Sequence, residues 1–308
     1  MEKNRQNHIK YYLLIICAAV LWASSGTASK YLFNSGMDPY ALVQYRVSFS
    51  AIILGAYLLL VKPHLLKIRP QHLWHFAILG AGMGGVQFTY LFAISKINVA
   101  IAILMQYMAP FFIAIYSFLF FKELINRWKV FSIVMAFTGC FFAVEAYNVA
   151  ILALNWHGIT AGLSSALFFS FYTIMGERVM RHYSPWAVLF YAFAFSSIYF
   201  SILLNPANLF FSDMQFLWVI TVIYVVVIGT AIPFGLFFMG IEYLRSTRAS
   251  VVASFEPISA GIFSFIFLGE ALTLWQVFGG LLVIGSIIII QLEKEIDPEA
   301  PAYKKLAI

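Results

Sequence analysis

The sequence predicts an all-α integral membrane protein with ten transmembrane helices, arranged as two inverted five-helix repeats. Three observations lead to this prediction: an apolar composition, ten apolar segments of membrane-spanning length, and a repeat that relates the two halves. Of the 308 residues, 62% are apolar and 10% are charged. Soluble domains are about 45–50% apolar and about 25% charged. So few charges cannot cover a water-soluble surface, and we therefore expect the chain to lie in a lipid bilayer.

Ten apolar segments account for most of the chain. A helix needs about 20 residues to cross the hydrocarbon core, and short polar breaks such as Lys62-Pro63-His64 and Arg245-Ser246-Thr247-Arg248 separate the segments. The expected spans are Tyr11–Phe33, Tyr40–Val61, Leu73–Ser95, Val99–Phe121, Val130–Tyr147, Trp156–Val179, Pro185–Leu204, Met214–Ile241, Ala249–Leu268 and Leu274–Gln291. The expected division is a tail of residues 1–10, repeats over 11–147 and 156–292, and a second tail of residues 293–308.

The basic residues predict the orientation. With the N-terminus in the cytoplasm, 16 of the 19 Lys and Arg residues fall in cytoplasmic segments, and the outer segments hold only Lys30 and Lys96. Positive charge is usually concentrated in cytoplasmic loops. We therefore expect a multi-pass protein of the cell membrane with both tails in the cytoplasm. The net charge of +6 has the same explanation, so we expect the lipid bilayer as a partner and no nucleic acid.

The two halves resemble each other at an offset of 146 or 147 residues. The rarer residue types that coincide are Pro39 with Pro185, Tyr45 with Tyr191, Pro110 with Pro257, Glu123 with Glu270 and Trp128 with Trp275. Each half has five expected spans, an odd number, so the second half must enter the membrane upside down. Inverted repeats are common in secondary transporters, with the binding site near the membrane midplane where the halves meet.

Several motifs resemble those of one transporter group. These are Leu21-Trp22-Ala23-Ser24, Asp38-Pro39 and, in the second half, Phe255-Glu256-Pro257 followed by Leu268-Gly269-Glu270. In them the chain resembles the EamA-type ten-helix members of the drug/metabolite transporter superfamily, from about Tyr11 to Gln291. The first half departs from the pattern, with Ala109 in place of the first Glu and Lys122 in place of the Gly. The resemblance implies export of amino acids or related small metabolites, without specifying the substrate.

Glu256 is the carboxylate that we place near the middle of a span. Ionisable residues at bilayer depth cost at least about 2.5–3.5 kcal/mol to insert, so they are candidates for function. Glu256 is accordingly predicted to couple transport to a proton or cation, or to contact a substrate amine. The alternative is a neutral carboxyl that only hydrogen-bonds a neighbouring helix. Arg46 is expected to reach the interface or pair with a backbone carbonyl, although it could also face an acidic group of the substrate.

A substrate cavity is expected between the halves. Gln87 and Gln106 are costly to expose to lipid and should face the interior of the bundle. Trp22 and Phe168 come from related positions of the two halves, as do Gln87 and Phe237. The predicted substrate-binding residues are Trp22, Gln87, Tyr90, Gln106, Phe168, Tyr172, Phe237 and Glu256, with Tyr107 also considered.

Other features are expected to be structural. Asn126 and Thr273 are predicted helix N-caps, the Gly-rich run Gly80–Gly85 is predicted to allow close helix packing, and the repeated Glu123 and Glu270 are assigned structural roles. Cys17 and Cys140 lie in apolar segments and are expected to pack. His75 lies alone in the third span. No metal site, cofactor or catalytic residue is expected.

The favoured function is a secondary transporter that exports a small metabolite, with amino acids as the expected class, by alternating access. A passive channel or facilitator is kept as an alternative, and a membrane-embedded enzyme as a weaker one. The chain has no phosphate-loop motif and no catalytic pair in its spans, which argues against an ATP-driven pump and against an enzyme. A homodimer is left open.

Overall fold

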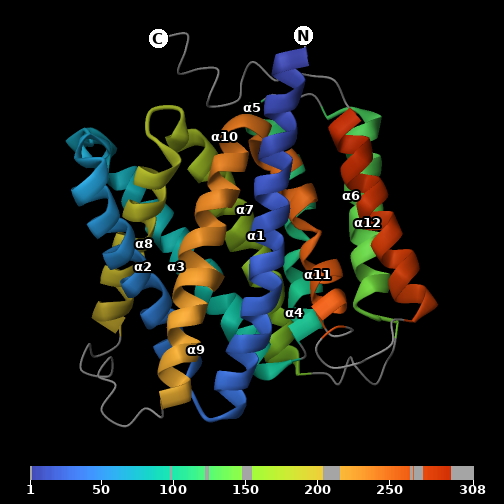
Figure 1. The fold of residues 1–308 in the computed structure, drawn as a ribbon, viewed down its shortest axis with the longest axis horizontal. Helices are drawn as coiled ribbons and strands as arrows, with labels where there is room; N and C mark the ends of the chain where they lie inside the picture. The colour runs from blue at the N-terminus through green and yellow to red at the C-terminus, as the bar shows by residue number, and fades with distance from the viewer. Residues whose placement is uncertain are drawn as a thin grey trace.

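The computed structural model describes residues 2–97, 99–121, 125–147, 155–203, 216–263, 266 and 273–292. Every regular element in this part of the chain is a helix. The elements, drawn in Figure 1, are α1 (Glu2–Asn34), α2 (Pro39–Val61), η1 (Pro63–Leu66), η2 (Pro70–His72), α3 (Leu73–Lys96), α4 (Val99–Gln106), α5 (Ala109–Phe121), α6 (Arg127–Ala143), α7 (Trp156–Met180), α8 (Pro185–Leu203), α9 (Phe216–Val226), the π-helical turn η4 (Val227–Ala231), α10 (Ile232–Ala253), α11 (Glu256–Phe263) and α12 (Leu274–Leu292).

Eight helical segments within the described residues are long and apolar enough to cross a membrane. The two remaining expected spans take other forms. The segment expected at Val130–Tyr147 is α6, which has 17 residues and a length of about 25 Å at 1.5 Å per residue. The segment expected at Ala249–Leu268 is divided between the end of α10 and α11. The predicted tails, apart from residues 2–10, and Glu123 and Glu270 lie outside the described residues.

Two helices are broken at corresponding places in the halves. The expected fourth span is α4 and α5, which are separated by a turn at Tyr107 and Met108. The expected ninth span is broken by a turn at Ser254 and Phe255, just before α11 begins at Glu256. These turns are 147 residues apart, the offset of the sequence repeat. In both halves a proline follows as the second residue of the new helix, where its missing N–H costs no hydrogen bond.

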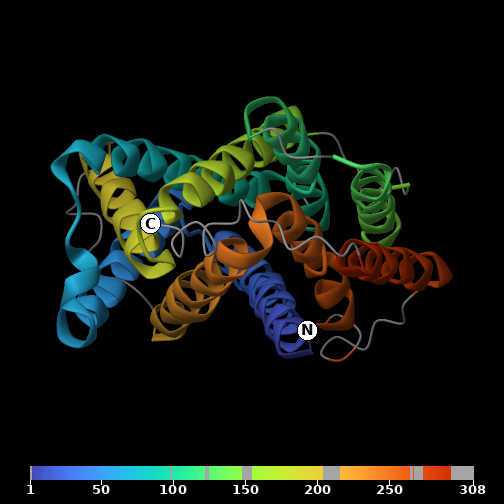
Figure 2. The same ribbon diagram turned by 90° about the horizontal axis from the view of Figure 1, so that it is seen from above.

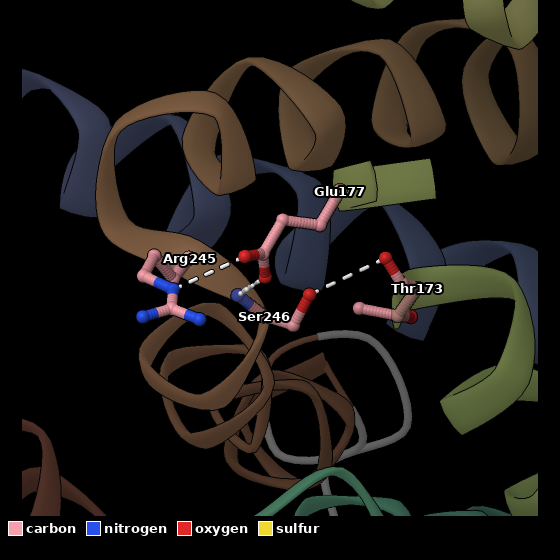
Figure 3. A network of polar contacts seen from close by, with 4 residues as sticks. All are labelled: Thr173, Glu177, Arg245 and Ser246. Carbon is pink, nitrogen blue, oxygen red and sulfur yellow. Dashed lines mark hydrogen bonds and ion pairs between the residues drawn. The ribbon is translucent and has the colours of Figure 1, made fainter. Parts of the chain in front are cut away.

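The polar segment expected between the eighth and ninth spans is a buried kink. The apolar segment Phe216–Ala253 has 38 residues, nearly twice the length that a bilayer requires. Arg245 interrupts it with φ 65° and ψ 167°. Glu177 of α7 accepts hydrogen bonds from Arg245 Nε at 3.1 Å and from the backbone N–H of Ser246 at 2.8 Å, as Figure 3 shows. All three residues are buried, so the expected polar loop is in fact an internal junction.

The helices pair in a pattern that relates the two halves. The most extensive contacts join α6 with α12, α3 with α7, α1 with α10, and α8 with α2 and α3. Figure 2 shows α6 and α12 side by side at one edge of the bundle. They approach closely at Gly139 and Gly279, where a Cβ on either glycine would lie 2.5–2.7 Å from the other's carbonyl oxygen.

The Gly-rich run in α3 permits two further close contacts. A Cβ added at Gly80 would lie 2.4 Å from Phe195 of α8, and one at Gly85 would lie 2.4 Å from Phe168 of α7. The predicted role in close packing is thus confirmed. The N-caps are confirmed as well, because Asn126 accepts from the backbone N–H groups of Trp128 and Lys129, and Thr273 accepts from that of Gln276. Cys140 is buried as expected, whereas Cys17 is exposed on the surface of the bundle.

Candidate functional site

A cavity lies where the broken helices meet α1, α2 and α3. Both halves contribute to it: the first supplies most of the wall, and the second supplies residues of α7, α10 and α11. The lining residues are Trp22, Ser25, Gly26, Arg46, Val86, Gln87, Tyr90, Gln106, Tyr107, Ala109, Pro110, Phe169, Phe234, Ser250 and Glu256.

Glu256 is the buried carboxylate of this cavity, and two tyrosines hold it. Tyr107 Oη is 3.0 Å from Glu256 Oε2, and Tyr90 Oη is 3.3 Å from Oε1. The break between α10 and α11 places the Glu256 side chain at the first residue of a helix, where free backbone N–H groups favour negative charge. Tyr107 occupies the corresponding break of the first half. The hydrogen bond between Tyr107 and Glu256 therefore joins the two helix breaks.

Arg46 brings a positive charge to the same cavity. It is buried, and it donates from Nε to Thr230 Oγ1 at 2.7 Å and from an Nη atom to the carbonyl of Gly229 at 3.1 Å. Both partners belong to the π-helical turn η4, and such turns leave backbone carbonyls accessible to side chains. Arg46 thus pairs with a backbone carbonyl, one of the two structural roles considered for it, while it also lines the cavity.

The wall on the second half is aromatic. The indole of Trp22 makes edge contacts with Phe234 and Phe237, with ring centroids 5.0 and 5.3 Å apart, and a longer one with Phe169. The Nε1 atom of Trp22 and the hydroxyl of Ser25 are buried and have no hydrogen-bond partner among the described residues. A buried donor without a partner is costly, so both groups are available to a polar molecule in the cavity.

The structure brings five of the eight predicted substrate-binding residues together in the cavity wall: Trp22, Gln87, Tyr90, Gln106 and Glu256. Tyr172 and Phe237 are fully buried one layer behind it, with Tyr172 stacked on Phe238 at 4.9 Å and Phe237 packed on Trp22. Phe168 lies elsewhere, because its side chain is 39% exposed and packs over Gly85 on the outside of the bundle.

Phe169, the next residue along α7, lines the cavity where Phe168 was expected. Successive residues of a helix point about 100° apart, so an error of one residue in the repeat alignment changes which side chain faces inward. Arg46 and Phe234 were not on the predicted list of binding residues, and Tyr107 was considered but left off it. An alignment of the two helix breaks would have drawn attention to Tyr107, since it lies two residues before the position that corresponds to Glu256.

The cavity is narrow in this conformation. Its volume is about 30 Å³, whereas sites for drug-sized ligands occupy about 300–1,000 Å³. A substrate as large as an amino acid would fit only after the walls move apart. The site can offer such a molecule one carboxyl, one guanidinium, two tyrosine hydroxyls and an indole N–H.

A family model described as the EamA-like transporter family matches the chain twice, over residues 9–144 and 156–292. An uncharacterized inner membrane transporter of Salmonella typhimurium, YicL, is 28% identical over 290 residues, which are 92% of this chain and 96% of that protein. An uncharacterized transporter of Archaeoglobus fulgidus is 29% identical over 89% of this chain and 94% of its own length. The threonine/homoserine exporter RhtA of Escherichia coli is 24% identical over 90% of this chain and 87% of its own length.

A solved crystal structure has the same fold. It matches with a TM-score of 0.72 over 91% of this chain and 95% of the other, at 19% sequence identity. At this identity the match concerns the arrangement of the helices and not the substrate.

Proposed function

The chain belongs to the EamA-like transporter family, and on this premise we propose that it exports a small zwitterionic metabolite of the amino-acid class by proton-coupled alternating access. That it is a membrane transporter follows from the family and from its apolar helices. The proposal concerns the substrate, the coupling and the mechanism. It is carried by one observation, the buried carboxyl of Glu256 held between Tyr90 and Tyr107 in a cavity shared by the two halves.

Coupling is proposed at Glu256 because its partners suit both protonation states. The hydroxyl of Tyr107 has one hydrogen but faces two acceptors, the carbonyl of Ala253 at 2.5 Å and Glu256 Oε2 at 3.0 Å. A protonated carboxyl can donate to the Tyr107 oxygen while Tyr107 donates to the carbonyl. An ionised carboxylate is instead suited to a substrate ammonium group. Proton and substrate would therefore compete for Glu256, which is a simple form of exchange.

The substrate class is proposed from the two opposite charges in one cavity. Glu256 matches an ammonium group, and Arg46 matches a carboxylate, which its planar guanidinium can bind with two hydrogen bonds. The unpaired donors of Trp22 and Ser25 supply further polar contacts. The relative RhtA is a threonine/homoserine exporter, which agrees with this class.

Alternating access between two inverted repeats is proposed from the sequence repeat that relates the halves. The matched helix breaks, and the pairing of α1 with α10 and of α3 with α7, support it. If the halves exchange their conformations, an opening on one side of the membrane closes while the other opens. Ten crossings, both termini in the cytoplasm and outward net flux belong to the same proposal.

The decisive variant is Glu256→Gln in proteoliposomes, assayed by counterflow of labelled threonine under imposed pH gradients. Glutamine keeps the shape and most hydrogen bonds of the carboxyl but does not titrate. We expect normal expression, with either a loss of pH dependence or a fall in rate of roughly tenfold or more, equivalent to about 1.4 kcal/mol. The matched control is Glu145→Gln, a carboxylate outside the cavity, which should leave both quantities unchanged.

Two results would reject the proposal. An unchanged rate and pH profile in Glu256→Gln would leave the residue a purely structural contact. Flux without acceleration by substrate on the opposite side would favour the passive channel, because trans-stimulation requires a carrier. Competition by threonine methyl ester, which lacks the carboxylate, tests the substrate class and should be at least about tenfold weaker than competition by threonine.

A further inference from the structure

A basic cavity lies at the end of the bundle where α1 begins, away from the proposed transport site. It is formed by η1 and η2 of the first half and by the turn between α7 and α8 of the second, which lie side by side in Figure 1. Two adjoining hollows of about 450 and 310 Å³ make up the cavity and share His72, Arg181, His182 and Tyr183.

The lining of this cavity is cationic. It contains four Lys and Arg side chains and four histidines, and among the described residues that line it there is no carboxylate. No group of three or more His, Cys, Asp or Glu side chains in the described part of the chain could hold a metal ion. Guanidinium, ammonium and imidazole groups around a hollow form the usual recognition site for phosphate. The basic residues are Lys67, Arg69, Arg178 and Arg181.

Contacts between the halves hold the cavity in shape. The hydroxyl of Tyr183 accepts a hydrogen bond from the backbone N–H of Arg69 at 3.1 Å and lies 2.8 Å from Nδ1 of His72. The rings of His72 and His182 are 5.6 Å apart, as are those of His72 and His75. His75, which the sequence placed alone, therefore belongs to a cluster. These contacts distinguish the cavity from scattered basic residues on a loop.

An apolar groove adjoins the basic cavity. Arg178 lines the smaller hollow and also a third one of about 190 Å³, between α5 and α7, whose walls include Phe112, Leu167 and Phe171. Leu167, Phe171 and Arg178 follow one another along one face of α7, at helical spacings of four and seven residues. Leu167 is 54% exposed, so the groove opens on the lipid-facing surface. Trp74, whose ring lies 3.8 Å from that of His75 in the basic cavity, is 56% exposed, as expected for an aromatic residue at the membrane interface.

We infer that this cavity binds a phosphate group, and that an anionic phospholipid supplies it, with the phosphate among Arg69, Arg178 and Arg181 and one acyl chain in the groove between α5 and α7. A soluble phosphate shares the headgroup chemistry but leaves the groove empty. A ligand here touches both halves, so it stabilises the conformation in which η2 lies against the α7–α8 turn. The inference concerns binding and does not depend on the identity of the transported substrate.

The test measures binding to the full chain purified in a neutral detergent, by native mass spectrometry and by thermal shift. The probes are dioctanoyl phosphatidylglycerol, dioctanoyl phosphatidylcholine, glycerol 3-phosphate and inorganic phosphate. The test variant is Lys67→Gln/Arg69→Gln, because both side chains are exposed and the backbone bond of Arg69 remains. The control is Lys62→Gln/Arg127→Gln, which removes the same charge from two exposed positions outside the cavity.

We expect phosphatidylglycerol to bind at least about tenfold more tightly than phosphatidylcholine. The test variant should weaken its binding roughly 10- to 30-fold, since each cation near an anionic lipid contributes about fivefold. The control should change binding less than about threefold. If glycerol 3-phosphate and inorganic phosphate bind as well as the lipid, with the same sensitivity to the variant, the phosphate site stands and its source is soluble.

Three outcomes would overturn the inference. The first is equal binding of the anionic and zwitterionic lipids without effect of the soluble phosphates, and the second is equal weakening by the two double variants. The third concerns the acidic C-terminal segment, which carries Glu293, Glu295, Asp297 and Glu299. If a chain with these four residues neutralised binds the anions and the unaltered chain does not, the cavity serves the chain's own tail.

Discussion

The two halves of this protein stabilise the same junction with opposite charges. In the first half Lys30 of α1 donates from Nζ to the carbonyls of Ile94 at 2.7 Å and Ile97 at 3.1 Å, where α3 ends. In the second half Glu177 of α7 accepts from Arg245 and from the backbone N–H of Ser246 at the kink of α10. At the repeat offset of 146 residues, Glu177 corresponds to Tyr31, which directly follows Lys30.

The difference shows that a helix junction exposes two kinds of backbone group. The end of one helix leaves carbonyls without partners, which a cation can satisfy, and the start of the next leaves N–H groups, which an anion can satisfy. The first half uses the former and the second half the latter. Replacing the charged residue should cost a different amount of stability in each half. Glu177 also neutralises a buried Arg245, whereas Lys30 bonds only neutral carbonyls in these contacts.

The largest effect is expected from Glu177→Gln. It leaves the charge of Arg245 buried without its carboxylate, and breaking a buried pair in this way costs about 3–5 kcal/mol. Unfolding in detergent, followed by thermal shift and denaturant titration, measures the loss. The double variant Glu177→Gln/Arg245→Gln removes both charges and should recover part of the stability. If the single variant is as stable as the unaltered protein, the ion pair has no structural role and Glu177 does not stabilise the junction in α10.

A smaller effect is expected where the halves are alike, at the contact of α6 with α12. A Cβ at Gly279 would lie 2.5 Å from the backbone N of Ala143, whereas one at Gly280 would be 4.0 Å from its nearest neighbour. Gly279→Ala should therefore destabilise the protein by about 1–3 kcal/mol through overpacking. Gly280→Ala is the matched control, and it should be neutral or slightly stabilising because alanine favours helix. Equal melting temperatures for the two variants would contradict the close approach of these helices.

The smallest effect is expected from Lys30→Met. The variant removes two hydrogen bonds but leaves only neutral carbonyls behind, so the expected loss is about 1–2 kcal/mol. Lys96→Met changes an exposed lysine at the same junction and should cost less than about 0.5 kcal/mol. The same melting experiments give all of these values. A loss for Lys30→Met as large as that for Glu177→Gln would show that the sign of the charge does not determine the cost.

The sequence alone determined that this chain is an all-helical membrane protein with a repeat, and it singled out Glu256. These properties follow from composition and from local spacing, because lipid requires long apolar helices whatever their packing. It also predicted the N-caps and the close packing of the Gly-rich run. It did not separate α4 from α5 or α10 from α11, because both breaks lie inside long segments that are mostly apolar and the turns are stabilised by contacts with other helices.

Only the tertiary structure decided which side chains meet. The rotation of each helix about its axis determines whether Phe168 or Phe169 faces the cavity, and that rotation is set by packing against α3. The carboxyls of Glu177 and Glu256 find their partners 68 and 149 residues away, and no sequence pattern indicates which side chains lie opposite them. The basic cavity likewise joins residues near position 70 with residues near 180. Burying a polar group costs free energy unless a partner lies beside it, and the fold is what brings the two together.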